Sequence, residues 1–131
     1  MSALASAPAR RVLVVDDNQD AADSLAMLLS AHGDEVRTAY DGEEAIEADA
    51  CFLPGIVLLD IGLPKLSGYD VARDIRERRG AGVLIVAITG WGQDEDRQRS
   101  RDAGFDHHFT KPVDIESLLE TLERERPRAL S

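Results

Sequence analysis

The chain has 131 residues, of which 44% are hydrophobic and 31% are charged. These values are typical of one soluble globular domain with a buried core. There are 25 acidic residues against 15 basic ones, which gives a formal net charge of −10. That sign argues against nucleic-acid binding, for which a basic face is the usual requirement, and it is compatible with a metal ion or a basic partner.

We expect no targeting signal in the N-terminal stretch. Residues 1–10 are rich in Ala and Ser and are predicted to form a disordered tail, followed by one domain over 11–126 and a short tail over 127–131. The apolar run after Arg10 and Arg11 is only four residues long, too short for a signal peptide, and no segment approaches the roughly 18 apolar residues of a membrane span. The single cysteine, Cys51, excludes an internal disulfide. We therefore expect a cytoplasmic protein without membrane contact, with Cys51 mostly buried.

Strand-like and helix-like segments alternate along the chain. The predicted strands are 11–15, 35–39, 56–59, 83–88 and 107–110. Three of them are nearly continuous aliphatic runs, as expected for strands covered on both faces. Such alternation with short connections predicts a parallel sheet with right-handed crossovers.

The first two predicted helices each have an apolar side. The first ends at Gly33, and the second begins at Asp41 with Glu44 three residues later, which is a capping-box pattern. The first helix is expected to direct inward Ala21, Leu25, Leu28 and Leu29. The second is expected to direct inward Ile46, Ala50 or Cys51, and Leu53.

The later helices differ in how firmly they are expected to pack. The third begins at Ser67 and runs to about Arg79, and the fifth is capped by Asp114. The apolar positions of the fifth helix have i, i+3, i+4, i+7 spacing and are Ile115, Leu118, Leu119 and Leu122. The fourth, over 93–103, has almost no apolar face. It is either a solvated surface helix or a weakly held element that shifts when its neighbours change.

Polar residues follow four of the five predicted strands. In an open parallel sheet these positions meet at one edge, where ligands bind. After the first strand come Asp16 and Asp17, after the third Asp60, after the fourth Thr89, and after the fifth Lys111 and Pro112. Any one of them alone is more often a loop start or a helix cap, so the prediction of a site rests on their conjunction.

These residue types suit phosphoryl chemistry. Carboxylate oxygens are the ligands that Mg²⁺ prefers. Lys111 can supply positive charge to a phosphoryl group and Thr89 a hydrogen bond. Asp60, on the central strand, is placed to act as a carboxylate nucleophile. The pattern therefore predicts a site for a divalent cation together with an oxyanion.

The same motifs carry a family resemblance. The acidic pair Asp16–Asp17, the segment LLDIGLPKLSGYD around Asp60, AITG with Thr89, and KP at 111–112 resemble the receiver domain of two-component response regulators over residues 11–126. The resemblance implies a flavodoxin-like, doubly wound α/β fold with a five-stranded parallel sheet in the order 2-1-3-4-5. It also implies that Asp60 accepts a phosphoryl group from a histidine kinase or histidine phosphotransfer protein.

The resemblance assigns a role to each site residue. Mg²⁺, or Mn²⁺, would be bound by Asp17, Asp60 and the backbone carbonyl of Gly62, with Asp16 acting through a water molecule. Lys111 would neutralise the phosphoryl charge and Thr89 would reorient to bond it.

The resemblance also implies roles for Gly90 and Pro112 and a mode of action for the whole protein. Gly90 would leave room for the phosphoryl group, and Pro112 would shape the lysine loop through a cis peptide bond. The expected protein is an autocatalytic phosphoacceptor switch rather than a turnover enzyme. It would lack an attached output domain and would be a monomer or a phosphorylation-dependent dimer. Its downstream partner would bind the face formed by the fourth helix, fifth strand and fifth helix.

One position departs from the family pattern. His108 stands where receivers usually carry Tyr or Phe, and it is either a tolerated polar ring or a modulator of the switch.

Two other classes of protein share parts of this pattern. A haloacid-dehalogenase-type phosphohydrolase would want Asp-x-Asp after the first strand and a cap domain. A flavin-binding module would want a Ser/Thr/Gly-rich phosphate loop, whereas DDNQD at 16–20 would repel a phosphate.

Overall fold

The computed structural model describes residues 10–90 and 101–124. Its centre is a five-stranded sheet in the order β2-β1-β3-β4-β5, in which every neighbouring pair is parallel. The strands are β1 (Arg11–Val15), β2 (Glu35–Ala39), β3 (Ile56–Asp60), β4 (Leu84–Thr89) and β5 (His107–Thr110). The predicted fold class and strand order are therefore confirmed.

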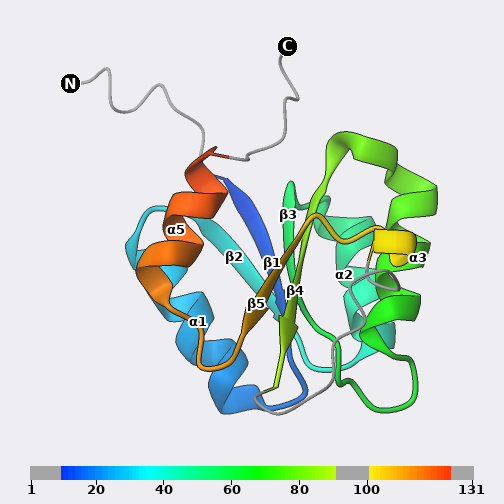
Figure 1. Cartoon of the computed structure of the whole chain (residues 1–131), viewed down its shortest axis with the longest axis horizontal. Coiled ribbons are helices and arrows are strands. Elements are labelled where there is room, and N and C mark those ends of the chain that lie inside the picture. The colour runs from blue at the N-terminus through cyan, green and yellow to red at the C-terminus, as the bar shows by residue number, and fades with distance from the viewer. Residues whose placement is uncertain (1–9, 91–100, 125–131) are drawn as a thin grey trace.

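Helices cover both faces of the sheet (Figure 1). One face carries α1 (Gln19–Ala31) and α5 (Ile115–Arg124), and the other carries α2 (Gly42–Phe52) and α3 (Gly68–Arg79), with a short 3₁₀ turn, η2 (Gly80–Gly82), leading into β4. Residues 101–103 are helical, but most of the predicted fourth helix, together with Trp91, lies outside the described residues. Within the described ranges, no helix combines the length and apolarity that crossing a bilayer requires.

The aliphatic strands divide the core into two halves. Alternate side chains of β1, β3 and β4 enter opposite faces, so that Leu13 and Val57 pack towards α2 and α3, while Val14 and Leu58 pack towards α1 and α5. All residues of β3 and β4 are buried. The strands are continuous apolar runs because helices cover both faces of the sheet. Polar groups can therefore gather only at the ends of these strands.

Local sequence signals determine where the helices begin and end. The side chains of Asp41 and Ser67 cap α2 and α3 by accepting hydrogen bonds from backbone N–H groups three residues later. The Glu44 carboxylate accepts from the N–H of Tyr40 rather than from that of Asp41, a shifted form of the predicted capping box. Gly33, with φ of +106°, follows the end of α1 as predicted.

The inward faces of α1 and α2 differ from the prediction. Leu28 is half exposed because α1 is rotated so that Ala22 and Leu29 are its buried residues. Cys51 was expected to be buried and is exposed, as are Ala50 and Leu53. The buried side of α2 instead carries Ala45, Asp49 and Phe52, and Leu53 lies beyond the helix end in a left-handed conformation with φ of 51°.

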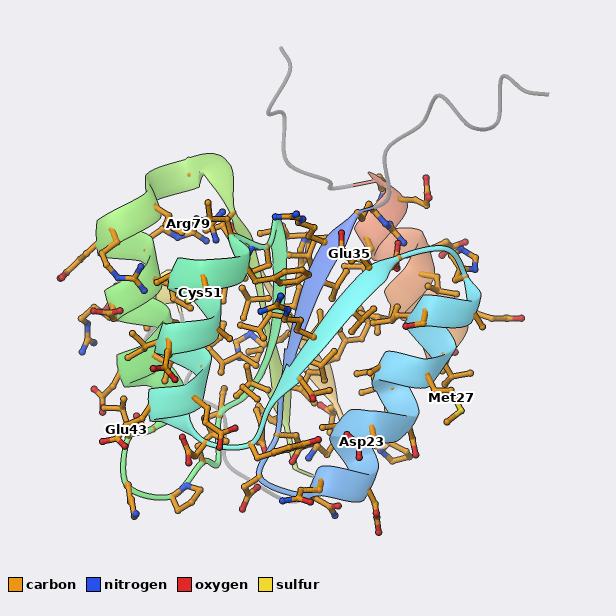
Figure 2. All side chains as sticks on the ribbon, turned by 180° about the vertical axis from the view of Figure 1, so that it is seen from behind. Asp23, Met27, Glu35, Glu43, Cys51 and Arg79 are labelled. Carbon is orange, nitrogen blue, oxygen red and sulfur yellow. The ribbon has the colours of Figure 1, made fainter. Side chains whose placement is uncertain are left out.

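One of the buried residues of α2 is an aspartate, Asp49. Asp49 has an exposed side-chain fraction of 0%, and its Oδ1 lies 2.6 Å from Nη1 of Arg79 on α3. Nη1 of Arg78 lies 3.3 Å from Oδ2 of the same carboxylate. Because a buried carboxylate is costly unless it is paired, this contact fixes α2 against α3 (Figure 2 labels Arg79 beside Cys51 of α2).

A third arginine of α3, Arg76, connects this helix to the residues just before β4 and β5. The guanidinium of Arg76 donates to the carbonyl oxygens of Gly80, Val83 and Gly104 and to the carboxylate of Asp106. Asp106 also accepts the N–H of Ile85 at 2.8 Å. This end of α3 is therefore attached on both sides, to α2 and to the strand starts.

Replacing Arg79 tests the buried pair. Arg79→Ala leaves Asp49 buried without its closest counter-charge, and we expect the free energy of unfolding to fall by about 3 kcal/mol. The control is Arg73→Ala, because Arg73 and Asp70 are 3.8 Å apart and about half exposed, so the loss there should be about 0.5 kcal/mol or less. Equal losses in urea denaturation would show that the buried pair does not stabilise the fold.

Candidate functional site

The predicted site residues meet at the carboxyl edge of the sheet. Asp16 directly follows β1, Asp60 and Thr89 are the last residues of β3 and β4, and Lys111 directly follows β5. Backbone bonds hold these ends in register: the N–H of Asp16 donates to the carbonyl of Ala39 at 3.1 Å, and that of Lys111 to the carbonyl of Thr89 at 2.8 Å. The lower end of the sheet in Figure 1 is this edge.

The carboxylates of Asp16, Asp17 and Asp60 form one cluster. Each offers an oxygen that lies within 4.8 Å of the oxygens of the other two. Asp16 and Asp60 are 6% and 7% exposed, whereas Asp17 lies at the surface. Two of the negative charges are therefore held in a poorly solvated position, where their mutual repulsion is weakly screened.

Lys111 supplies the positive charge that faces this cluster. Its Nζ lies 2.7 Å from Oδ2 of Asp16 and 3.5 Å from Oδ2 of Asp60. The Lys111–Pro112 peptide bond is cis, as expected. The ammonium group thus joins the ends of β1, β3 and β5 in one ion-paired arrangement.

The pKa values of Asp60 and Lys111 are both raised, which favours the neutral form of the carboxyl group and the charged form of the amine. Burial raises the pKa of Asp60 above its ordinary value of 3.8, and the neighbouring Asp16 charge raises it further, against the lowering effects of the Gly62 N–H and of Lys111. For Lys111, burial lowers the pKa, but the hydrogen bond to Asp16 and the charges of both carboxylates outweigh it, so the pKa is raised. Lys111 therefore stays charged, while the ionised form of Asp60 is disfavoured.

This donor set fits a small divalent cation. All three side chains present oxygen atoms, which Mg²⁺ prefers, and the exposed Asp17 leaves one side of the cluster open to water. A cation bound there would also relieve the repulsion that raises the pKa of Asp60. The residues present are thus able to hold Mg²⁺ or Mn²⁺.

The other predicted residues surround this cluster. The N–H of Gly62 donates to Oδ1 of Asp60 at 2.9 Å. The hydroxyl of Thr89 donates to the carbonyl of Phe109 at 3.5 Å, so turning it towards a ligand would break this bond. Gly90 follows Thr89 at the end of β4. His108 is half-buried on β5, with its ring centroid 6.2 Å from that of Phe105.

Two features of the site were not predicted from the sequence. Asn18 donates its N–H to Oδ1 of Asp16 at 3.0 Å and caps α1 through its side chain. An Asx-type residue before a helix is a recognisable capping signal, so Asn18 could have been found. The direct pairing of Lys111 with Asp16 had no local signal, because the two residues are far apart in the chain.

An apolar cavity of about 480 Å³ lies beside the charged cluster. It is bounded by α1 and by the segment between β5 and α5, and its lining includes Asp16 and Lys111. Its apolar lining includes Leu25, Leu28, Ile88, Pro112 and Val113. Leu28 is half exposed, and Met27, which is 71% exposed, points outward from α1 in Figure 2.

Known proteins resemble this chain in sequence and in structure. The structure resembles that of a CheY-like response regulator receiver domain protein from Methanospirillum hungatei, with a TM-score of 0.83 and 28% identity over 89% of this chain and 93% of that one. An uncharacterised 14.6 kDa protein of Leptolyngbya boryana is 32% identical over 86% of this chain and 87% of its own length. Response regulator MprA of Mycolicibacterium vanbaalenii is 38% identical over 83% of this chain.

These likenesses define an α/β signalling module. The chain belongs to the response regulator receiver domain family, whose model matches residues 12–123. It spans about half the length of several curated relatives, 46% and 47% in two of them. Membership in this family sets aside the phosphohydrolase and flavin-binding alternatives.

The raised pKa of Asp60 predicts how stability depends on pH. A carboxyl group whose pKa is raised by folding contributes stability below its ordinary value of 3.8 and loses it as pH rises through the folded-state value. In metal-free buffer at about pH 7, Asp60→Asn should therefore be more stable than wild type, and the difference should vanish at about pH 4. Urea midpoints measured in EDTA across this range would check it.

The control for this series is Asp20→Asn, which removes the same charge from an exposed position on α1. It should not raise stability at neutral pH. Mg²⁺ should stabilise wild type more than Asp60→Asn, because only the native carboxylate cluster retains all its charge. A less stable Asp60→Asn protein at neutral pH would contradict the assigned electrostatics.

Proposed function

We propose that this receiver accepts a phosphoryl group on Asp60 from a phosphohistidine of a histidine kinase or histidine phosphotransfer protein. The observation that carries the proposal is the buried Asp60 carboxylate, which lies in one cluster with Asp16 and Asp17 and 3.5 Å from the ammonium of Lys111. An Asp60 oxygen forms a bond to phosphorus while the phosphorus–nitrogen bond breaks. The histidine nitrogen leaves with the electron pair.

The acidic cluster would hold the cation that this reaction needs. Asp17, Asp60 and the backbone carbonyl of Gly62 would bind Mg²⁺ directly, and Asp16 would act through a water molecule. Bound there, Mg²⁺ would offset the negative charge of the phosphoryl oxygens. The contribution of the protein is to hold its carboxylates in place before the donor arrives, which is what phosphoryl transfer mainly requires.

Lys111 and Thr89 would respond to the new charge. The ammonium of Lys111 can exchange Asp16 for a phosphoryl oxygen, since its Nζ already lies between Asp16 and Asp60. Thr89 would turn its hydroxyl from the carbonyl of Phe109 to the phosphoryl group, with Gly90 leaving room and Pro112 shaping the lysine loop. Through β5 this change would reach His108, which occupies the switch position.

The surroundings of the site support a protein partner on each side. The apolar cavity between α1 and the start of α5 is lined in part by Lys111 and Asp16, so a phosphodonor protein docking there would bring its histidine close to Asp60. The downstream partner would bind the face of the fourth helix, β5 and α5, and α5 has exposed carboxylates at Glu116 and Glu120. We place this exchange in the cytoplasm. The protein would act as a switch, as a monomer or a phosphorylation-dependent dimer, rather than as a turnover enzyme.

Phosphoryl labelling tests the acceptor. With Mg²⁺ and a small phosphodonor, wild type should acquire an acid-stable, base-labile phosphoryl group, whereas Asp60→Asn should not, because the amide lacks the nucleophilic oxygen anion. Asp20→Asn is the matched control and should label like wild type. Beryllofluoride with Mg²⁺ should change the fluorescence of Trp91, which follows Thr89 by two positions in the sequence. Labelling of Asp60→Asn at the wild-type level would refute the proposed acceptor.

Lys111→Met separates metal binding from phosphoryl transfer. Removing the ammonium takes away a cation that competes for Asp16 and Asp60, so Mg²⁺ should bind at least as tightly as in wild type. Labelling should slow by about 10²-fold, since the charge that stabilises the transferring group is lost. Calorimetric Mg²⁺ titration and labelling kinetics would measure the two effects, with Lys111→Arg as the charge-conserving comparison. Unchanged labelling would remove Lys111 from the mechanism.

A further inference from the structure

The segment between β3 and α3, residues 61–67, directly follows Asp60 and is in close contact with two glycines. One is Gly68, the first residue of α3. A Cβ at this position would lie 2.6 Å from the carbonyl oxygen of Asp60 and 2.6 Å from Cα of Ile61. Both are backbone atoms, which cannot rotate away. Any side chain at position 68 would therefore push the start of α3 away from the end of β3.

The second glycine approaches the same segment from α2. Gly42 is the first residue of that helix, and a Cβ there would lie 2.8 Å from Cβ of Leu66 and 2.9 Å from its carbonyl oxygen. The 61–67 segment is thus in tight contact with the beginnings of two helices. Neither glycine has a positive φ, so neither is required by its backbone conformation. What both positions require is space, even though alanine is the better helix former.

The confined segment controls the geometry of the acceptor. Gly62 donates its N–H to Oδ1 of Asp60 at 2.9 Å. The N–H of Gly68 donates to the carbonyl of Ile61 at 3.2 Å, and the N–H of Ile61 donates to the carbonyl of Ile88 on β4 at 3.1 Å. A shift of the segment would therefore move Gly62 relative to the Asp60 carboxylate, although neither Gly42 nor Gly68 has a side chain that could bind a ligand.

We propose that Gly42 and Gly68 are positioning residues for the metal and phosphoryl site, acting by letting α2 and α3 press the 61–67 segment into the place that orients Gly62 and Asp60. The inference rests on the proposed function in one respect: Gly62 and Asp60 are the groups that would bind Mg²⁺. It goes further by assigning a part in that binding to residues outside the charged cluster.

The test compares four variants of the full chain, three with alanine in place of a glycine and one with a smaller core residue. Gly68→Ala and Gly42→Ala introduce the close contacts. Gly82→Ala is the matched control, since a Cβ at Gly82 meets nothing within 4 Å and its φ is not positive. Ile75→Val weakens the buried side of α3 and shows what mere destabilisation does. Mg²⁺ affinity is measured by calorimetry with MgCl₂, and amide exchange of Gly62 by NMR in metal-free buffer.

Gly68→Ala should weaken Mg²⁺ binding by about tenfold or more, as loss of support for metal ligands generally does, and Gly42→Ala should weaken it less. In both, the Gly62 amide should exchange faster, while the Ile85 amide, bonded to Asp106, should not change. Gly82→Ala and Ile75→Val should stay within about twofold of wild type in Mg²⁺ affinity.

Mg²⁺ affinity and Gly62 exchange at wild-type values in both Gly42→Ala and Gly68→Ala would overturn the inference. If Gly68→Ala does not fold, Gly42→Ala decides, because part of its close contact is with the Leu66 side chain, which can move. If wild type itself binds no Mg²⁺, the proposed function fails instead. The Gly62 exchange rate in metal-free protein still decides whether the two glycines position the acceptor.

Discussion

The site of this protein depends on one constraint, which is that two carboxylates are buried close together at the end of the sheet. Asp16 and Asp60 are almost fully buried and share a cluster with Asp17, so the folded protein needs a cation there. Lys111 meets the need with an ion pair of 2.7 Å to Asp16 and a longer one of 3.5 Å to Asp60. The shorter pair therefore neutralises the carboxylate of Asp16 more fully than that of Asp60.

The remainder of the fold keeps this edge of the sheet in place. The aliphatic strands bring four chain ends together, and the tight contacts at Gly42 and Gly68 hold the segment that follows Asp60. At the opposite end of α3, the pairs of Arg79 with Asp49 and of Arg76 with Asp106 attach that helix to its neighbours. Close packing at one end of α3 and ion pairs at the other therefore attach this helix to its neighbours beside the charged cluster.

What could be predicted from the sequence follows from how local each signal is. The strands and the caps at Asp41 and Ser67 depend on neighbouring residues, and their prediction was accurate to within one residue. The exposed Cys51 was mispredicted because the buried face of α2 is set by Asp49, whose partners lie on α3. Nothing near Asp49 in the sequence marks it as a paired charge. The Lys111–Asp16 pair was missed for the same reason.

The distance along the chain between these two residues has a consequence for biosynthesis. Asp16 and Lys111 are 95 positions apart, so the acidic cluster obtains its counter-charge only when the last strand has joined the sheet. Until then, a growing chain carries Asp16 and Asp60 without their lysine, and closing such a long-range contact is intrinsically slow. A fragment ending before β5 would therefore keep Asp16 and Asp60 but lack the ammonium group that pairs with them. The ion pairs of Lys111 with Asp16 and Asp60 are thus present only when the whole domain has folded.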